Sequence, residues 1–502
     1  MTTLTSLARA LAADRGVAQP AATVRHVHLA RRPLVLIPLA LAGEANAPLA
    51  AMVGDDPESP TLLTVAQPRN RDQRFAFAAA LARIVVGYIE RFCAVEETVP
   101  GGRGQQPRTR YADAPQILVP NPAGIAFLRL LGRSTRFRRP SGEYPVDPAV
   151  PVLGRWLTFF AERAELPGSC LLLAATDALS LHWATGQSPV EDQNLGALVG
   201  WIDPSAGQTG AEAAAAAEDP LAWPPGGPAT DPTFDNEVLA PLIAACDAAA
   251  GDPVRYRRAE AALRDALAGQ LRPTWRLMWQ AAGLLRRLPP GAHVTGRWAA
   301  DRDAFTGHAA QLRDGGPPQA RRDSAVAAAR RLDWLERVQA SYAAQRAFDD
   351  PLVMAEHRMN GEAFAGTVVT AEPDRIDASG GRRKLRPLIT IATGDPVRAE
   401  PGARLVSPAR PGQQARLVSL TAGSGTGAAW TAVLELSGGT GRGLTAPPGT
   451  VPAVGEQICL STTTDSWQPP PWFPQREETP WTHGGPPPAY VPYDADAAED
   501  WS

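Results

Sequence analysis

Two acidic residues and an amide flank a short apolar segment near the start of the chain. Asp55 and Asp56 precede the strand-like run 62–65, and Gln67 and Arg69 follow it. Carboxylate and amide oxygens suit Mg²⁺, and a bound Mg²⁺ can activate a water for attack on a phosphodiester. If the ends of the two segments meet, Asp55 and Gln67 are candidate metal ligands. Arg69 is then the candidate group beside the attacking water.

This order of residues resembles the core of metal-dependent nucleases of the restriction-enzyme type, over about fifty residues. In that core an Asp in one strand and a Gln-x-Lys or Glu-x-Lys in the next gather the metal, and the lysine positions the water. Here Arg69 replaces the lysine, and arginine does not release a proton at working pH. Pro68 also falls inside the second strand, where proline is disfavoured. The resemblance implies an active or degenerate nuclease; the open alternative is an ordinary turn over 55–59.

The chain has almost no lysine, which restricts the reactions that it can catalyse. Lys384 is its only lysine, and it stands in Arg-Arg-Lys-Leu-Arg, outside any phosphate-binding loop. A P-loop needs Gly-x-x-x-x-Gly-Lys-Ser/Thr, because the lysine contacts the phosphates. Kinase-type catalysis and Schiff-base chemistry also need a lysine. The sequence therefore excludes a P-loop NTPase, and we expect no ATP hydrolysis by this chain alone.

Other motif-like strings have plain structural interpretations. Residues 423–428 match the glycine pattern of dinucleotide-binding loops, but an alternating strand at 430–436 follows where that motif needs a helix. We therefore interpret 423–428 as a hairpin connection. His26 and His28 share one face of a predicted strand, with no third ligand adjoining them. They are interpreted as structural or surface histidines, so no metal site and no cofactor are predicted.

A basic cluster lies in a β-rich region near the C-terminus. Residues 358–450 hold eleven Arg or Lys against seven Asp or Glu. Small barrels often bind single strands with basic loops and aromatic side chains. The candidate nucleic-acid-binding residues are Arg382, Arg383, Lys384, Arg386 and Trp430. The alternative is that the cluster is a solvated hairpin tip.

The last residues are rich in proline and tryptophan and end acidic. Aromatic and proline side chains can dock in apolar grooves, and unordered tails rarely contain this many tryptophans. The candidate partner-binding residues are Trp467, Trp472, Trp481, Pro487, Pro488 and Tyr490. We interpret this tail as a segment that packs on its own barrel or on a partner protein.

Composition restricts the class of protein. The chain has 502 residues and a net charge of −3, so it exceeds one ordinary core and has no overall attraction to nucleic acid or membrane. Its four cysteines lie far apart, without a Cys-x-x-Cys pair, which favours a reducing compartment. The longest apolar run, 33–42, is about half the length that spans a bilayer. A cytoplasmic protein without membrane contact is expected.

The first 202 residues alternate between strand-like and helix-like patterns, which favours an α/β layer domain. The predicted strands are 24–30, 34–41, 49–53, 62–65, 117–119 and 171–174. The predicted helices are 75–92, 122–131, 153–164 and 189–201. Asn121, Pro122 and Gly132 mark the expected start and end of the second helix.

The remaining segments differ in pattern. Residues 203–233 have the composition of an Ala/Pro/Gly-rich linker, and 234–350 show the 3–4 spacing of a helical bundle. Residues 361–465 show short strands at 364–370, 388–392, 404–406, 415–420, 430–436 and 457–461. Such strands, punctuated by Gly and Pro, predict a small β-barrel or sandwich, with 466–502 as the tail.

The sequence thus predicts a multi-domain α+β protein with an α/β layer domain, a helical middle bundle and a small C-terminal barrel. The function expected from it is a non-catalytic accessory or scaffold subunit. Its barrel and tail would contact a protein partner or nucleic acid. The metal-dependent nuclease in the N-terminal domain is the alternative.

Overall fold

The computed structural model describes residues 3–44, 47–101, 106–220, 222–378, 381, 383–422, 429–441, 443–466, 469–474, 478 and 491. The chain divides into two compact units. We call the first, Thr5–Leu332 with Trp472–Ser502, the sheet unit. The second, Asp333–Pro471 with Met1–Leu4, is the barrel unit. The predicted fold class is confirmed, with an α/β region in the N-terminal part and a closed barrel in the C-terminal part.

The sheet unit is built around a five-stranded sheet of order β4-β3-β2-β7-β8. Its strands are β2 (Leu34–Ala40), β3 (Pro48–Gly54), β4 (Thr61–Thr64), β7 (Ile117–Val119) and β8 (Leu172–Ala174). β2, β7 and β8 run parallel, whereas β2, β3 and β4 form an antiparallel meander. Every residue of β2 is buried. A strand with both faces covered needs a continuous apolar run, which explains the pattern at 34–40.

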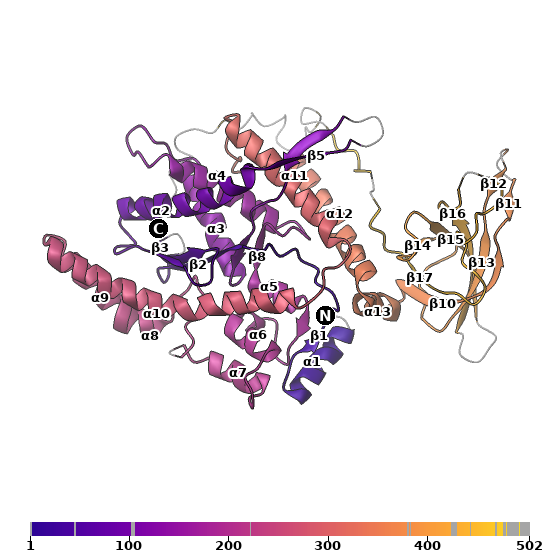
Figure 1. Ribbon diagram of the computed structural model, residues 1–502, viewed down its shortest axis with the longest axis horizontal. Helices are drawn as coiled ribbons and strands as arrows, with labels where there is room; N and C mark the ends of the chain where they lie inside the picture. Colours follow the sequence, from indigo (N-terminus) through magenta and orange to yellow (C-terminus); the bar gives the residue numbers. More distant parts are fainter. Residues whose placement is uncertain are drawn as a thin grey trace. The chain divides into compact units, whose positions relative to one another are not determined.

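Helices cover one face of this sheet above β2 and β3 (Figure 1). They are α2 (Arg71–Glu90), α3 (Pro122–Thr135), α4 (Ala149–Ala164) and α11 (Val294–Arg313). Leu34 and Leu36 of β2 enter this core together with Phe160 and Phe305. Alternate residues of β2 therefore point to opposite faces, and these two point towards α2 and α4.

The opposite face of the sheet is covered mainly by α10 (Pro253–Arg286), with α5 (Ala175–Ser180) and α6 (Leu195–Ile202). Val35 and Ile37 of β2 pack in one core with Trp275 and Met278 of α10. Buried residues of the helical segments between 234 and 313 therefore pack in the same cores as the sheet. Their amphipathic pattern predicted the apolar face correctly, but a pattern does not say which surface covers that face.

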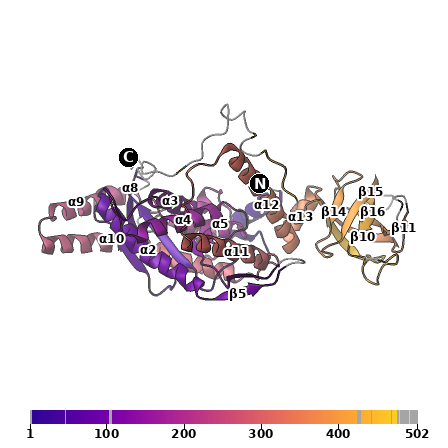
Figure 2. The same ribbon diagram turned by 90° about the horizontal axis from the view of Figure 1, so that it is seen from above.

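Segments around these layers depart from the sequence prediction in two places. The predicted strand at 24–30 is wrong, because Arg25 makes only one isolated bridge, to Pro290. The predicted linker contains α7 (Gly210–Ala217), which begins with a Thr209–Glu212 capping box and packs on α6. Short helical pieces follow: α8 (Pro232–Phe234), η3 (Asp235–Leu239) and α9 (Ala240–Ala248). α9 runs alongside the first part of α10 (Figure 2).

Smaller elements complete the sheet unit. They are α1 (Thr3–Arg15), η1 (Arg91–Cys93), η2 (Glu191–Gln193), and the paired strands β1 (Gln19–Pro20) with β9 (Trp183–Ala184) and β5 (Glu96–Val99) with β6 (Arg108–Tyr111). α12 (Ala325–Asp349) contributes its first turns to this unit. Within the described ranges, no helix has the length and apolar character to cross a membrane.

The barrel unit contains the rest of α12, α13 (Pro351–Met359) and a closed antiparallel barrel of order β10-β13-β16-β15-β14-β17. Its strands are β10 (Ala363–Glu372), β13 (Leu388–Thr393), β14 (Arg404–Val406), β15 (Gln414–Ala422), β16 (Trp430–Ser437) and β17 (Gln457–Ser461). β11 (Ile376–Asp377) pairs with β12 (Lys384–Leu385) in a separate hairpin. All six strands predicted from the sequence in this region are confirmed within a few residues.

The glycine-rich string 423–428 lies outside the described residues, but its flanking strands are clear. β15 ends at Ala422 and β16 begins at Trp430, and these two residues pair antiparallel. The string therefore connects neighbouring antiparallel strands. A dinucleotide-binding loop would instead lead from a strand into a helix.

Candidate functional site

Asp55 lies in the turn that follows β3. Its carboxylate accepts hydrogen bonds from Arg91 Nη2 at 2.7 Å and from Arg32 Nη2 at 3.4 Å. Both arginines are more than half exposed, so these are surface ion pairs of small energetic value. The carboxylate expected to bind a metal is thus engaged with two cationic side chains.

Gln67 and Arg69 lie at the other end of the β3–β4 hairpin. At the turn end of the hairpin, near Asp55, Val53 pairs with Thr61. At the other end, near Gln67, Ala50 pairs with Thr64. The length of β4 therefore separates the two sites by more than about 10 Å. Gln67 Nε2 donates to Asp247 at 2.8 Å, and Arg69 Nε donates to Glu44 at 2.6 Å.

The structure therefore does not bring Asp55 and Gln67 together. Asp55 lies in the turn that joins β3 to β4, and Gln67 follows β4 at the open end of the hairpin, whereas a shared metal requires both groups at one end. Among the described residues, no group of three or more His, Cys, Asp or Glu is placed to hold a metal ion. The geometry gives the nuclease alternative no support.

The basic cluster of the barrel unit lies on and beside β12. Arg383, Lys384 and Arg386 make no ion pair with any carboxylate that the structure describes, although Asp377 stands opposite Lys384 in the hairpin register. Arg382 lies outside the described residues. Arg375 and Arg416, by contrast, both bind Glu435; burial opposes ionisation of this carboxyl, but the two arginines hold its pKa below the usual value.

Trp430 does not lie beside this cluster. Leu388, near Arg386, pairs with Glu435, whereas Trp430 pairs with Thr393 at the far end of the same two strands. Five residues of antiparallel strand separate these ends by roughly 17 Å. Phe364 is buried in the barrel core. The structure thus separates the basic residues from the aromatic ring that was expected to stack beside them.

Most of the predicted tail site lies outside the described residues. This applies to Trp467, Trp481, Pro487, Pro488 and Tyr490. Trp472 is described, and its side chain is 78 % exposed. An indole that is exposed to this extent presents apolar ring surface to solvent.

The structure also contains a polar pocket that no sequence motif indicated. We call it the arginine pocket; its volume is about 400 Å³. Its first two walls are the facing sides of α3 and α4. α3 and its C-cap contribute Arg129, Arg133 and Arg136, and α4 contributes Thr158, Glu162 and Glu165. Each set follows the three- and four-residue spacing that places side chains on one side of a helix.

Two glycines allow α3 and α4 to approach closely. A Cβ atom at Gly132 would lie 2.8 Å from Thr158 N, and one at Gly154 would collide with Arg136 N. Side chains at either position would push the helices apart. The sequence interpretation of Gly132 as the end of the helix is wrong, because α3 continues to Thr135 and uses this glycine for packing.

The third wall comes from the segment before α12 and from the first turns of that helix. Three hydrogen bonds fasten this segment to α3 and α4: Arg155 Nη2 to Gly316 O at 2.7 Å, Gln319 Nε2 to Arg155 O at 3.0 Å, and Arg136 Nε to Gln319 O at 3.0 Å. Arg321, Asp323 and Arg331 then line the pocket opposite the two helices.

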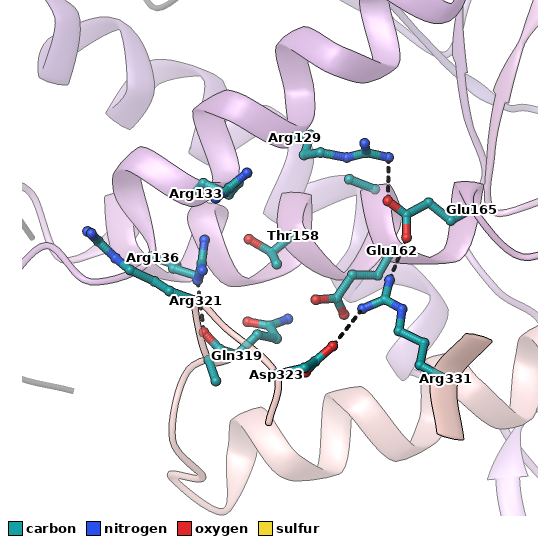
Figure 3. Close-up of a pocket in the computed structure, with 12 residues that line it drawn as sticks. Arg129, Arg133, Arg136, Thr158, Glu162, Glu165, Gln319, Arg321, Asp323 and Arg331 are labelled. Atoms are coloured by element: carbon teal, nitrogen blue, oxygen red, sulfur yellow. Dashed lines mark hydrogen bonds and ion pairs between the residues drawn. The ribbon is translucent and has the colours of Figure 1, made fainter. Parts of the chain in front are cut away.

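The charges in the pocket are divided between its two sides (Figure 3). Arg133, Arg136 and Arg321 lie on one side, and Glu162, Glu165 and Asp323 lie on the other. Arg129 Nη2 binds Glu165 at 2.9 Å, and Arg331 binds both Glu165 and Asp323. The guanidinium groups of Arg136 and Arg321 both lie over the Phe137 ring.

Glu162 and Arg133 have no hydrogen-bond or ion-pair partner within the described part of the chain. Both side chains reach solvent. The pKa of the Glu162 carboxyl is nevertheless raised, because desolvation by the pocket walls outweighs the attraction of Arg331 and Arg136, and Glu165 and Asp323 add repulsion. One cation and one carboxyl group of the pocket are therefore available to a ligand.

Sequence reasoning missed this pocket for a clear reason. The spacing of Arg129, Arg133 and Arg136 could have signalled a basic helix side, and that of Glu162 and Glu165 an acidic one. No local pattern, however, indicates that residues 319–331 close the site. Comparison with known proteins finds no matching family model, no matching curated protein and no matching solved structure.

Proposed function

We propose that this chain is a non-catalytic accessory or scaffold subunit that engages a protein partner through its proline- and tryptophan-rich tail. The observation that carries this proposal is the exposure of Trp472, at 78 %, within a segment of four prolines between 469 and 474. A rigid indole flanked by prolines loses little conformational entropy on docking, and tryptophan is among the commonest interface anchors. The nuclease alternative is not part of the proposal, because Asp55 and Gln67 lie at opposite ends of their hairpin.

The test compares two tryptophan variants in co-purification of the full chain with its partner. With Trp472→Ala the partner should no longer co-purify, because an apolar anchor contributes about 2 kcal/mol or more to binding at a hot spot. The matched control is Trp223→Ala, which removes another exposed indole, 39 % exposed, from the sheet unit. The complex should survive about 0.5 M salt, at which surface electrostatics are largely screened. Recovery of the same partners by wild type, Trp472→Ala and a chain ending before Trp467 would refute the proposal.

Nucleic-acid contact at the β11–β12 hairpin is the second candidate. Its supporting observation is that Arg383, Lys384 and Arg386 lack carboxylate partners in the described region, whereas Arg410 is paired with Glu456 at 2.7 Å. Phosphate contacts release counterions, so affinity must fall as salt rises.

This second candidate is tested by gel shift with single-stranded DNA over a salt series. Replacing Arg382, Arg383 and Arg386 by Ala should flatten the slope of log K against log salt by about 0.7–0.9 for each phosphate that is no longer neutralised. The control Arg410→Ala removes a paired arginine and should leave the slope unchanged. No binding at low salt would remove this candidate. We favour the protein partner, because Trp430 lies far from the basic residues.

A further inference from the structure

The arginine pocket has more positive than negative charge in its lining. Five arginines and three carboxylates line it, which leaves a surplus of two positive charges when all are ionised. Glu165 and Asp323 are already bound by Arg129 and Arg331. Arg133, which has no ion-pair partner among the described residues, lies on the same side of the pocket as Arg136 and Arg321 (Figure 3).

We propose that the arginine pocket binds a small hydroxylated phosphate monoester, of the sugar-phosphate class, with its phosphate on the Arg133 side and its hydroxyl groups on the Glu162 side. A phosphate monoester carries about two negative charges at neutral pH, which suits a lining that holds more arginines than carboxylates. Guanidinium groups bind phosphate through paired, directional hydrogen bonds. This site is independent of the tail and of the barrel hairpin, so the proposal does not rest on the function proposed above.

The side opposite the phosphate supplies acceptors for hydroxyl groups. The Glu162 carboxylate has no partner among the described side chains and points into the pocket (Figure 3). Thr158 Oγ donates to Gly154 O at 2.8 Å, so a lone pair of this hydroxyl remains for a ligand. A carboxylate beside an anion would repel it, but a hydroxyl between the two satisfies both.

Size and lining narrow the ligand class further. A volume of about 400 Å³ lies in the range of small-molecule sites and exceeds what one inorganic phosphate needs. The lining residues are arginines, carboxylates, an amide, a hydroxyl and two alanines, so this described wall offers no aromatic ring for stacking on a base. A polyhydroxylated ester fits this lining better than a nucleotide does.

The raised pKa of Glu162 is consistent with the same arrangement. Its carboxyl can take up a proton at a higher pH than an ordinary glutamate does. The titratable groups around it are Arg136, Glu165, Asp323 and Arg331. Protonation removes one negative charge from the pocket, which reduces the repulsion between Glu162 and a bound phosphate.

The proposal is tested by titration calorimetry of the full chain at about 0.15 M salt. The three probes are glucose 6-phosphate, inorganic phosphate and glucose. We expect glucose 6-phosphate to bind most tightly, inorganic phosphate to bind more weakly and glucose not to bind. Arg133→Ala should weaken both phosphates about tenfold or more, as expected when a charge-assisted hydrogen bond is removed. Because Arg133 is exposed, this variant should fold normally.

Two further variants make the result specific. Arg287→Ala removes an exposed arginine that pairs with Asp203 in the same unit, and it should leave all affinities unchanged. Glu162→Ala should weaken glucose 6-phosphate but not inorganic phosphate, because only the ester has hydroxyl groups for this carboxylate. The proposal is overturned if neither phosphate binds, if Arg287→Ala acts as strongly as Arg133→Ala, or if Glu162→Ala leaves the preference for the ester intact.

Discussion

Each compact unit holds an aspartate between an arginine and a backbone amide, but in different surroundings. In the sheet unit, Asp301 accepts hydrogen bonds from Arg163 Nη2 at 2.7 Å, Ser169 Oγ at 2.7 Å and Cys170 N at 2.6 Å, and its side chain is 1 % exposed. In the barrel unit, Asp395 accepts two hydrogen bonds from Arg358, at 2.6 and 3.0 Å, with its side chain 20 % exposed.

The difference between these two aspartates reflects how the two units are built. Asp301 on α11 joins residues more than a hundred positions earlier in the sequence, inside a layered core. Asp395 joins Arg358 and Ala365 within one continuous barrel region. A buried charge without its partner cannot be rescued by water, whereas a partly exposed one can. The hydrogen bonds of Asp301 should therefore contribute more to the free energy of unfolding than those of Asp395.

The largest effect is expected for Asp301→Ala. This change leaves Arg163 without its carboxylate and Cys170 N–H without an acceptor inside the protein, and should cost about 3–5 kcal/mol of sheet-unit stability. Hydrogen–deuterium exchange, followed peptide by peptide, separates the two units. The control Asp314→Ala removes an exposed aspartate at the end of the same helix, which lies 4.0 Å from the exposed Arg313, and should cost about 1 kcal/mol or less. Equal losses of stability in the two variants would contradict the role that we assign to burial of the aspartate.

The next largest effect is expected for Gly154→Ala. Its methyl group would collide with Arg136 N, so α3 and α4 must separate, at a cost of about 1–3 kcal/mol. The control Gly283→Ala places a methyl group in open space on α10 and should be neutral or stabilising by up to about 1 kcal/mol. Urea denaturation measures the free energy of unfolding of both variants. Only Gly154→Ala should also lower the affinity of the arginine pocket for its ligand.

A pH-dependent difference is expected from His308. Burial lowers the pKa of this imidazole to about 4, and it stacks on Phe159 with 4.4 Å between ring centroids. Its unfolded pKa is about 6.5, so between about pH 6.5 and 4 the unfolded chain binds a proton that the folded chain does not. Stability of the sheet unit must fall as the pH is lowered through this window, by up to about 3 kcal/mol from this group.

His308→Phe removes this group while keeping a stacked ring. The decrease in stability between about pH 7 and 4.5, measured in urea, should be smaller in the variant than in the wild type. His28, whose pKa burial also lowers to about 4, should preserve part of the acid sensitivity. An unchanged pH dependence in His308→Phe would contradict the assignment.

The smallest effect is expected for Asp395→Ala, at about 1–2 kcal/mol and confined to the barrel unit. Although burial opposes ionisation, the hydrogen bonds from Arg358 and Ala365 N hold the pKa of the Asp395 carboxyl below its usual value. A lowered carboxyl pKa contributes stability above the unfolded pKa, near about 3.9, and this stability disappears as the pH falls further. The wild type and the variant should therefore converge in stability below about pH 4. A constant difference would show that packing, not charge, is removed.

Much of the fold was predictable because its signals are local. The barrel strands follow from alternating apolar residues between Gly and Pro turns, such as 430–436, where Ala432, Leu434 and Leu436 are buried. β2 follows from a continuous apolar run, and α2 from its amphipathic pattern. Three of the barrel's antiparallel pairs, β10–β13, β14–β15 and β15–β16, also join strands that follow one another along the barrel's chain, whereas β13–β16, β14–β17 and β10–β17 join distant ones.

The candidate sites were less predictable. Asp55 and Gln67 are twelve positions apart in the sequence, yet the hairpin register places them at opposite ends. Trp430 and Arg386 share a region, yet strand pairing separates them. Nearness in the sequence predicts nearness in space only where the intervening turn is known, and residue types alone do not supply that turn.

The sequence by itself determined the type of most elements, the absence of a P-loop motif, and the existence of a C-terminal barrel, because these depend on residue identity and short-range periodicity. Only the tertiary structure decided that α10 covers the same sheet as β2, that Gly132 and Gly154 bring α3 and α4 together, and that residues 319–331 close the arginine pocket. The physical reason is that an apolar or charged helix side specifies what it needs from a neighbour but not which distant segment provides it.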